Sequence, residues 1–277
     1  MTPFAEVIGQ PVAHSLSPAI HRHWLAALGI DGDFLATEVA PGALAEHLRA
    51  RRADPAWRGC SVTAPHKEAV LPLLDRVDDA AARIGAVNCV VRDGDGLAGR
   101  NTDVDGIAAA LAGVAIEGRK VAMIGGGGAA RAALACLDAA KAGEIAIVLR
   151  EPARGEALRS AYPDVQLAAL ADADRAFDGA ALVINASPMG LAGGAAMPAE
   201  VIAALPDGAA LFDMVYHPRE TALLAAGRAR GLRTIDGLAM LIGQARAAFA
   251  AFFGADPPAD DAALRQALDA DPCHARG

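Results

Sequence analysis

Short apolar segments alternate with helix-forming segments along most of the chain. The apolar segments are rich in Val, Ile, Leu and Phe and are bounded by turn residues, which is typical of strands. We expect strands over residues 4–9, 34–39, 57–62, 86–92, 121–124, 145–149, 165–167, 182–185, 210–213 and 233–235. From residue 121 onward the strands alternate with helices, which predicts an α/β unit with a parallel sheet.

Turn-forming residues indicate where two early helices begin. Ser17 is expected to cap a helix with Pro18 in its first turn, and Pro65 should lie in the first turn of another helix. His21 and His23 are two residues apart and so face different directions on the first helix. This spacing favours two surface histidines over a metal pair.

Two further helices are expected over residues 41–53 and 237–253. The first is charged, and we interpret its charged residues as a solvated face. These are Glu46, His47, Arg49, Arg51 and Arg52. The second is long and apolar. After it the composition shifts to Pro and Asp, so the tail to residue 277 is expected to be frayed.

A glycine-rich turn joins the strand at 121–124 to the helix that follows it. Gly125, Gly127 and Ala130 fill the G-x-G-x-x-G/A spacing of a dinucleotide site. The following helix would direct its free N–H groups and positive dipole end at a pyrophosphate. A flexible loop is the alternative interpretation. The candidate nucleotide-binding residues are Gly125, Gly126, Gly127, Gly128, Ala129 and Ala130.

Composition narrows the class of protein. A chain of 277 residues is long for one core, so two domains are expected. With 54% hydrophobic but only 4% aromatic residues, the interior suits helices packed on parallel strands. The net charge of −8 argues against nucleic acid or an anionic membrane as a partner, because both repel an acidic surface.

Cysteine usage points to a reducing compartment. The four cysteines are widely spread and form no C-x-x-C pair, which indicates neither a disulfide framework nor a zinc site (Cys60, Cys89, Cys136, Cys273). The chain shows no signal peptide and no membrane-spanning stretch, so a cytoplasmic protein without a metal is expected.

Two charged residues stand out before any family is considered. Lys67 is either a surface lysine or a functional cation, and its place at a helix N-terminus, where an acid is preferred, hints at function. Asp103 is either a helix cap or a functional acid. Ser15 and Ser17 could likewise cap a helix or hold a carboxylate.

Several motifs, in the same order along the chain, make this sequence resemble the shikimate dehydrogenases. They are HSLSP (14–18), SVTAPHKE (61–68), GAVNCV (85–90), NTD (101–103), GGGGAAR (125–131), NASPMG (185–190), DMVYHP (213–218) and Gln244 in the last long helix. The resemblance implies reversible NADPH-dependent reduction of 3-dehydroshikimate to shikimate in aromatic amino-acid biosynthesis.

The resemblance also implies a role for individual residues. Lys67 and Asp103 would be the catalytic pair. Ser15, Ser17 and Tyr216 would hold the substrate carboxylate, and the ring hydroxyls would be bound by Thr63, Asn88, Asp103 and Gln244. Added to the glycine-rich turn as cofactor-binding residues are Arg150, Arg154, Ser187, Met214 and Gly237.

The chemistry independently demands such a pair. Hydride delivery to a ketone leaves an alkoxide, which needs a positioned acid and a stabilising cation. Lys67 fits both needs. A neighbouring carboxylate raises the pKa of a lysine whereas burial lowers it, so we assign Lys67 and Asp103 jointly.

The resemblance implies a two-domain architecture with a cleft that can close. Residues 1–105, completed by 237–277, would form an α/β substrate domain. Residues 106–236 would form a Rossmann-type, doubly wound nucleotide domain, and the helix from 237 would return to the first domain. The binding partner would be the small-molecule substrate. The sequence is compatible with a homodimer but does not determine the oligomeric state.

Three positions depart from the family pattern. Ser61 stands where the family usually has Asn, and Ser187 where Thr is common. In the loop after the second strand of the nucleotide domain, Arg150 and Arg154 are kept but Glu151 lies beside them. We favour NADP on the two arginines, with NAD as an alternative because of the acid.

Other functions remain open. An NAD-dependent quinate/shikimate dehydrogenase is the nearest, and a nucleotide-binding regulator without turnover is another. A methyltransferase could use the glycine-rich turn, but it would not explain Lys67, Asn88, Asp103 and Gln244 together.

Overall fold

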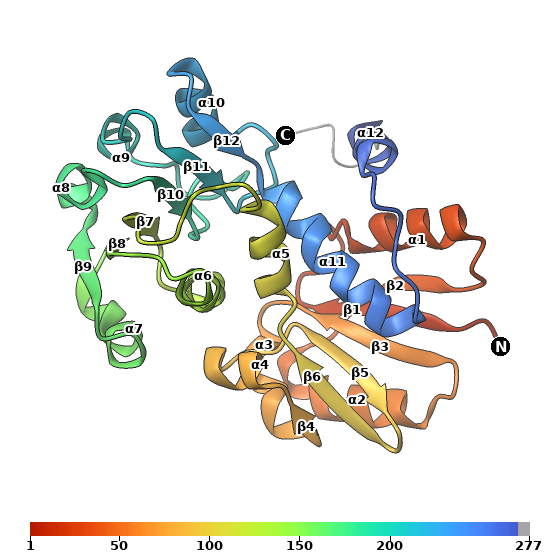
Figure 1. The fold of residues 1–277 in the computed structure, drawn as a ribbon. Helices are drawn as coiled ribbons and strands as arrows, with labels where there is room; N and C mark the ends of the chain where they lie inside the picture. Colours follow the sequence, from red (N-terminus) through yellow and green to blue (C-terminus); the bar gives the residue numbers. More distant parts are fainter. Residues whose placement is uncertain (271–277) are drawn as a thin grey trace. The chain divides into compact units, whose positions relative to one another are not determined.

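The structure, a computed structural model, describes residues 1–270 and divides into two compact units. Of the described residues, unit 1 contains Met1–Asp105 and 244–270, and unit 2 contains Gly106–Gly243. Helices α5 (Asp103–Ala110) and α11 (Gly237–Phe253) each carry the chain from one unit to the other. Each unit is built around its own six-stranded sheet (Figure 1).

The sheet of unit 1 is mixed, with the strand order β2-β1-β3-β5-β6-β4. Strand β1 (Phe4–Gly9) pairs in parallel with β2 (Asp33–Glu38) and β3 (Trp57–Val62). Strands β5 (Cys89–Asp93) and β6 (Gly96–Arg100) form an antiparallel hairpin beside β3, and the short β4 (Arg76–Val77) completes the edge. The carboxyl ends of β1 and β3 therefore meet at one edge of the sheet.

The helices of unit 1 cover this sheet with apolar residues. One core cluster joins Ile8, Trp57 and Val90, and another joins Phe34, Ala248 and Phe252. The helices that lie wholly in unit 1 are α1 (Ser17–Leu28), α2 (Leu44–Ala53), α3 (His66–Ala69), α4 (Asp79–Ile84) and α12 (Ala262–Ala270). The start of α5 and the end of α11 also belong to this unit. Short 3-10 turns lie at Pro41–Ala43 and Leu71–Leu73.

The sheet of unit 2 is entirely parallel, with the order β12-β11-β10-β7-β8-β9. Its strands are β7 (Val121–Ile124), β8 (Ile145–Leu149), β9 (Val165–Ala169), β10 (Leu182–Asn185), β11 (Ala210–Asp213) and β12 (Arg233–Ile235). This is the doubly wound order of a Rossmann unit, and it places the reversal of strand order between β7 and β10. The predicted fold class is confirmed.

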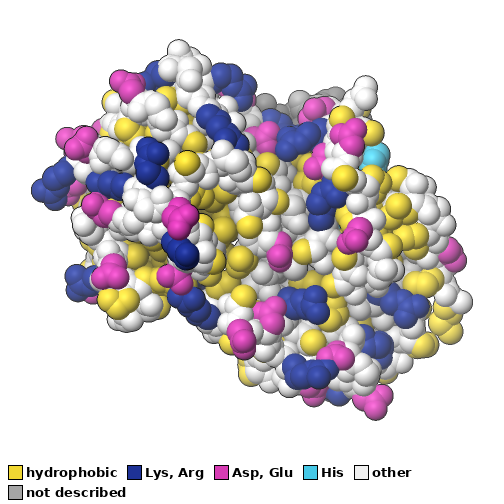
Figure 2. Space-filling view, in the orientation of Figure 1, with side chains coloured by type: hydrophobic (Ala, Val, Ile, Leu, Met, Phe, Trp, Pro, Cys, Tyr) yellow, Lys and Arg dark blue, Asp and Glu magenta, His cyan; other side chains and the backbone are white. Residues whose placement is uncertain are grey.

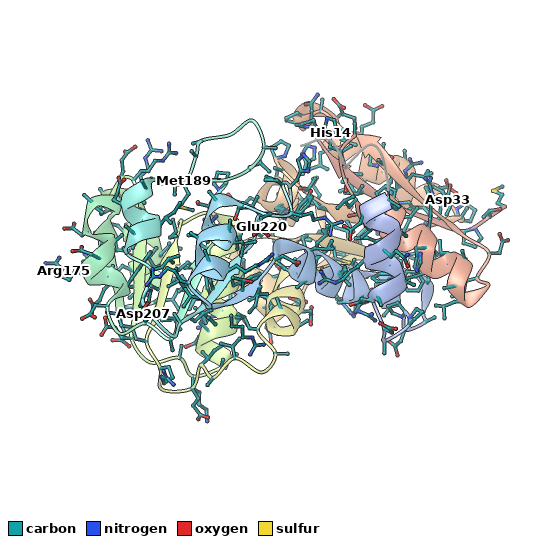
Figure 3. The ribbon with its side chains drawn as sticks, turned by 90° about the horizontal axis from the view of Figure 1, so that it is seen from above. His14, Asp33, Arg175, Met189, Asp207 and Glu220 are labelled. Atoms are coloured by element: carbon teal, nitrogen blue, oxygen red, sulfur yellow. The ribbon has the colours of Figure 1, made fainter. Side chains whose placement is uncertain are left out.

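Every residue of β7, β10 and β11 is buried, so both faces of the unit 2 sheet are covered, as a parallel sheet requires. One core cluster includes Phe177, Val201 and Leu223. Arg175 lies on the outer side of α8 (Figure 3), opposite that core. The helices are α6 (Gly128–Ala139), α7 (Glu156–Ala161), α8 (Ala173–Phe177), α9 (Ala199–Ala203) and α10 (Ala222–Ala229), with 3-10 turns at Pro152–Gly155 and Leu170–Asp172.

Two predictions about helix starts are wrong. Ser17 is the first residue of α1 rather than its cap; Leu16 precedes it and makes no side-chain capping bond. The Ser17 N–H instead donates to Ser15 Oγ at 3.3 Å, so the preceding serine satisfies that group. Pro65 lies just before α3 rather than in its first turn.

The tail prediction is also wrong for the described residues. After Gly254 the chain forms α12, whose Leu264 and Leu268 are buried. Arg246 fixes the approach to this helix by donating to the carbonyl of Pro258 at 2.5 Å and by pairing with Asp261. Residues 271–277, with Cys273, lie outside the described residues.

The charged face of α2 is not simply solvated, because it covers a buried carboxylate. Glu6 on the central strand β1 is completely buried. It accepts bonds from Arg51 Nε at 2.8 Å, Trp57 Nε1 at 3.0 Å and Thr37 Oγ1 at 2.5 Å, and lies 3.0 Å from His47 Nε2. Burial alone would raise the pKa of Glu6, but the hydrogen bonds outweigh it and lower the pKa to about 2.

His21 is a core residue, so its prediction as a surface histidine is wrong. The ring is fully buried and stacks on Phe34 at 3.9 Å between centroids, with Trp24 and Phe249 around it. Neither ring nitrogen has a hydrogen-bond partner. Burial lowers the pKa of His21 to about 3, because nothing compensates a charge there.

Charges of both signs are interleaved on the face drawn in Figure 2 rather than gathered in one patch.

No helix in the described part of the chain is long and apolar enough to cross a bilayer.

Substituting His21 should change the pH dependence of stability. The unfolded chain takes up a proton at this residue near pH 6.5 and the folded chain only near pH 3, so its stabilising contribution is present above pH 6.5 and is lost on acidification. Relative to wild type, His21→Phe should gain about 2 kcal/mol between pH 7.5 and 5, at about 1.4 kcal/mol per pH unit below 6.5.

Urea unfolding at several pH values measures this effect. The comparison concerns the slope with pH, because the larger Phe ring can itself cost stability at neutral pH. His23→Phe, on the same helix but partly exposed, is the matched control. Parallel pH profiles for wild type and His21→Phe would contradict the prediction.

Candidate functional site

Lys67 and Asp103 form an ion pair in unit 1. Lys67 is in the short helix α3, just after β3, and Asp103 is the first residue of α5. The Lys67 Nζ donates to Asp103 Oδ2 at 2.6 Å, and Asn88 Nδ2 donates to Asp103 Oδ1 at 2.8 Å. The structure therefore brings three of the predicted site residues onto one carboxylate.

Backbone hydrogen bonds hold these side chains in place. The Val87 N–H donates to the Lys67 carbonyl at 2.8 Å, which fixes α3 beside the start of β5. Asn88 Oδ1 accepts from the Thr102 N–H at 2.6 Å, and Asn101 Oδ1 accepts from the Asp103 N–H at 3.1 Å. The buried segment of residues 101–103 (Asn-Thr-Asp, the NTD segment) therefore presents Asp103 in one orientation.

Gln244 joins the same cluster through Thr102. The Thr102 hydroxyl lies 3.2 Å from Asn88 Oδ1 and donates to Gln244 Oε1 at 3.4 Å. Gln244 is 142 residues away along the chain, so this contact closes the C-terminal part of α11 onto the NTD segment.

The two charges differ in exposure. The Asp103 side chain is 10% exposed and the Lys67 side chain 31%. A carboxylate so far from water needs the donors that it has here. The Lys67 side chain keeps partial access to solvent while its ammonium group is bonded to Asp103.

The other predicted substrate residues have separate settings. Ser17 is buried and Ser15 half-buried at the start of α1. The methyl group of Thr63 lies so close to Gly9 that a Cβ there would be 2.4 Å from it, and the Thr63 N–H donates to the Ile8 carbonyl at 2.9 Å. Tyr216 belongs to unit 2, and burial raises the pKa of its hydroxyl.

The glycine-rich turn in unit 2 is shaped for a close ligand. Gly125 has φ +105°, and a Cβ there would lie 2.9 Å from the backbone of Ala186 and Ser187. A Cβ at Gly127 or Gly128 would meet no atom within 4 Å, so these two residues leave open space. Ala130 is fully buried, which lets α6 pack closely. This arrangement has the room and the backbone donors of a phosphate cradle.

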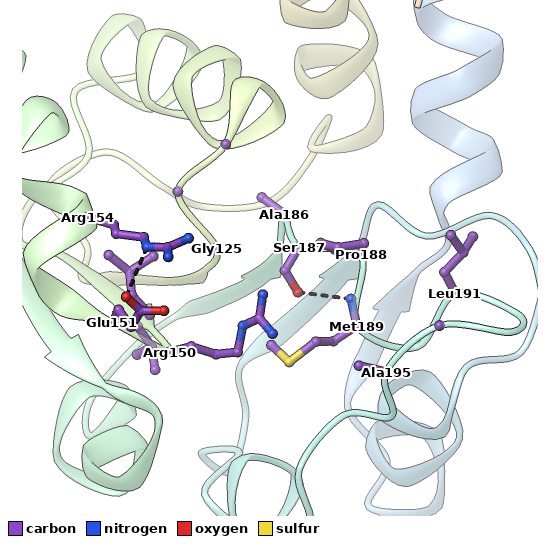
Figure 4. Close-up of a pocket in the computed structure, with 15 residues that line it drawn as sticks. Gly125, Arg150, Glu151, Arg154, Ala186, Ser187, Pro188, Met189, Leu191 and Ala195 are labelled. Atoms are coloured by element: carbon purple, nitrogen blue, oxygen red, sulfur yellow. Dashed lines mark hydrogen bonds and ion pairs between the residues drawn. The ribbon is translucent and has the colours of Figure 1, made fainter. Parts of the chain in front are cut away.

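A cavity of about 500 Å³ opens beside this turn (Figure 4). Of the predicted cofactor residues, those that line it are Gly125, Gly126, Gly127, Arg150, Arg154 and Ser187. It also includes Glu151, Met189 of the motif at 185–190, and residues of the following loop that the motifs did not indicate, namely Leu191, Gly194 and Ala195. The glycines at 190, 193 and 194 were the available signal of a loop there.

Gly128, Ala129, Ala130, Met214 and Gly237 do not line this cavity among the residues described. Gly237 and Met214 lie together, because a Cβ on Gly237 would be 2.5 Å from the Met214 carbonyl oxygen. The start of α11 therefore packs directly on the loop after β11.

The polar wall of the cavity is formed at the end of β8. Arg150 extends across the cavity toward Met189 in Figure 4. Arg154 Nε lies 3.0 Å from Glu151 Oε2, so these two residues form an ion pair of their own. Both side chains of the pair are largely exposed, at 78% and 63%.

A buried polar network in unit 2 fixes the loops after β10 and β11, and the sequence analysis missed it. Asn185 Nδ2 donates to Asp213 Oδ1 at 2.9 Å and to the Met189 carbonyl at 3.0 Å. Asn185 Oδ1 accepts from the Ser187 hydroxyl at 2.7 Å. Asp213 also accepts from the Thr221 hydroxyl at 2.7 Å. Burial raises the pKa of Asp213, opposed by the bonds from Thr221, the Val215 N–H and Asn185.

Within residues 1–270, no group of three His, Cys, Asp or Glu side chains is arranged to hold a metal.

The sequence matches a known family. A family model described as the shikimate dehydrogenase substrate binding domain matches residues 7–90. A curated relative from Sphingopyxis alaskensis, named shikimate dehydrogenase (NADP+), is 48% identical over 93% of each chain.

Solved structures match both units. Shikimate 5-dehydrogenase from Thermus thermophilus, in complex with NADP(H) and shikimate, is 36% identical with a TM-score of 0.84, over 96% of this chain and 98% of that one. Quinate dehydrogenase from Corynebacterium glutamicum, in complex with NAD, is 30% identical with a TM-score of 0.85, again over 96% and 98%.

Alanine substitutions in the glycine-rich turn should distinguish glycines that are needed for stability from glycines that leave space for a ligand. Gly125→Ala should lower the free energy of unfolding by about 1–3 kcal/mol, because the new Cβ meets backbone atoms and the positive φ is strained. Gly127→Ala should change it by less than about 0.5 kcal/mol but weaken nucleotide binding, because its Cβ enters open space in the cradle.

Urea unfolding and calorimetric titration with the nucleotide measure the two effects. Equal stability losses in both variants, or nucleotide binding unchanged by Gly127→Ala, would contradict this assignment of the turn.

Proposed function

The chain belongs to the shikimate dehydrogenase family, and we propose that Lys67 and Asp103 move the proton in the reaction of this enzyme. The enzyme is an NADP-dependent oxidoreductase that interconverts 3-dehydroshikimate and shikimate in aromatic amino-acid biosynthesis. The observation that carries the proposal is the Asp103 carboxylate, bonded to Lys67 at 2.6 Å and to Asn88 at 2.8 Å.

In this reaction NADPH supplies a hydride to the ketone carbon. The developing alkoxide then needs a proton and a nearby positive charge. The Lys67 ammonium provides both, and Asp103 orients it through its hydrogen bond. In the oxidative direction the same pair accepts the proton from the hydroxyl.

The residues of unit 2 fit a dinucleotide phosphate. The N–H groups at the start of α6 and the open space at Gly127 and Gly128 suit the pyrophosphate. Arg150 and Arg154 bring positive charge to the wall that we assign to a 2′-phosphate, where Arg154 is paired with Glu151. We assign Ser187, which lines the cavity, and Met214 and Gly237, which do not, to the same cofactor.

The remaining polar residues of unit 1 are assigned to the substrate. Ser15 and Ser17 would hold its carboxylate. Ring hydroxyls would bond to Asp103, Asn88, Thr63 and Gln244, of which all but Thr63 already belong to one hydrogen-bonded cluster. A cluster prebuilt in this way loses little side-chain entropy when it binds a ligand.

We also propose a cytoplasmic location. The described thiols of Cys60, Cys89 and Cys136 are buried and make no disulfide bond, which suits a reducing compartment.

The nearest alternative is oxidation of quinate with NAD, which the similarity to a quinate dehydrogenase supports. Purified protein should be assayed with shikimate and with quinate, each with NADP and with NAD, by the absorbance of the reduced nicotinamide. Fast turnover with shikimate and NADP supports the proposal. Comparable turnover with quinate and NAD favours the alternative, and no turnover with any pair contradicts both.

Removing the Lys67 amine should slow the chemical step. We expect Lys67→Ala to lower kcat by roughly 10²- to 10⁴-fold, the usual contribution of a positioned acid or base, with nucleotide affinity nearly unchanged. Steady-state kinetics and nucleotide titration measure both quantities. Lys120→Ala removes a lysine that pairs with Glu144 in unit 2 and serves as the control. Full activity of Lys67→Ala would refute the role of this residue.

Removing the two serine hydroxyls should act mainly on substrate binding. We expect Ser15→Ala combined with Ser17→Ala to raise KM for shikimate more than it lowers kcat, because anchoring a distant carboxylate stabilises ground state and transition state alike. The double variant should be compared with wild type under saturating cofactor. A change confined to kcat is the outcome that this assignment does not allow.

A further inference from the structure

We propose that Glu151 sets the nucleotide selectivity of the cavity by holding Arg154 in an ion pair, so that only Arg150 is free to receive a 2′-phosphate. This proposal rests on the proposed function and concerns the adenosine end of the same site.

The geometry of the turn keeps the pair together. Arg154 Nε lies 3.0 Å from Glu151 Oε2, and the Arg154 N–H donates to the Glu151 carbonyl at 3.0 Å. The backbone bond closes a 3-10 turn over Pro152–Gly155, which holds both side chains on one side of it. Both residues line the cavity that contains the glycine-rich turn (Figure 4).

The turn that carries the Glu151–Arg154 pair lies where a Rossmann unit recognises the ribose of the adenosine. It follows β8, the strand beside β7 in the parallel sheet. In a Rossmann unit an acid in this region bonds the ribose 2′-hydroxyl of NAD, whereas an arginine accommodates the 2′-phosphate of NADP. This chain places both kinds of residue at the same wall of the cavity.

Arg150 and Arg154 therefore differ. Arg150 makes no ion pair with any residue in the range 1–270, so its guanidinium can receive a phosphate directly. Arg154 can bind the phosphate only if its guanidinium leaves the Glu151 carboxylate. The carboxylate and the phosphate, both negatively charged, then lie close together. Binding of a nucleotide with a free 2′-hydroxyl needs no such exchange. Glu151 should consequently narrow the preference for NADP over NAD.

The first test is calorimetric titration of the whole chain with 2′,5′-ADP and with 5′-AMP, which differ in the 2′-phosphate. Glu151→Gln should raise affinity for 2′,5′-ADP by about 1.5- to 5-fold, because an exposed ion pair contributes a free energy that corresponds to a factor of this size. Affinity for 5′-AMP should stay the same or fall.

The control is Glu156→Gln. Glu156 pairs with Arg159 at 2.7 Å, three residues apart as in the first pair and similarly exposed, but neither residue lines the cavity. This variant makes the same change in net charge. An equal gain in 2′,5′-ADP affinity from Glu156→Gln would show a general charge effect and overturn the proposal.

A double-mutant cycle tests whether Glu151 acts through Arg154. Arg154→Gln should weaken 2′,5′-ADP binding less in the wild-type background than in Glu151→Gln, where the guanidinium is released. Equal losses in the two backgrounds would mean that Glu151 and Arg154 act independently, and would overturn the proposal. No gain in Glu151→Gln would overturn it as well.

These outcomes are separate from those of the proposed function. Nucleotide binding is measured without substrate, so a failure of shikimate turnover leaves the cycle interpretable. Conversely, full shikimate turnover with an unchanged preference between 2′,5′-ADP and 5′-AMP in Glu151→Gln would reject only this inference.

Discussion

The arrangement of unit 1 depends on the need of one carboxylate for partners. Asp103 is nearly buried, and a buried charge is stable only when it is paired and hydrogen-bonded. Its bonds to Lys67 and Asn88 join the segment after β3, the start of β5 and the start of α5. Folding therefore assembles the ion pair to which we assign proton transfer, and the lysine has its partner before any substrate binds.

Unit 2 follows from a different constraint, the parallel order of its sheet. Parallel strands end at one edge, and the loops after β7, β8 and β10 there form the walls of the cavity. The backbone of Gly125 touches the Ala186 loop so closely that no side chain fits between them. The glycine that permits the turn thus also sets the distance between two walls of the cavity.

Local sequence patterns predicted most of the strands and the parallel sheet of unit 2, because burial and turn chemistry act over a few residues, whereas the doubly wound order was implied by the family resemblance. The motifs also indicated Lys67, Asn88 and Asp103, which the structure joins. His21 and Glu6 show where such patterns fail. The partners of Glu6 are 31 to 51 residues away along the chain, so neither its burial nor the function of the charged helix α2 can be read from neighbouring residues.

Motif residues also differ in what they do, and only the contacts separate them. Asn185 and Ser187 belong to one motif, yet Ser187 lines the cavity while Asn185 is fully buried beneath it and bonds to Asp213 of another motif. Asn185 further bonds to Ser187 and to the Met189 carbonyl. A change at Asn185 would therefore affect the cavity through the loop that it supports, whereas a change at Glu151 alters the cavity wall itself. The sequence of a motif gives both residues equal weight, and the buried hydrogen bonds tell them apart.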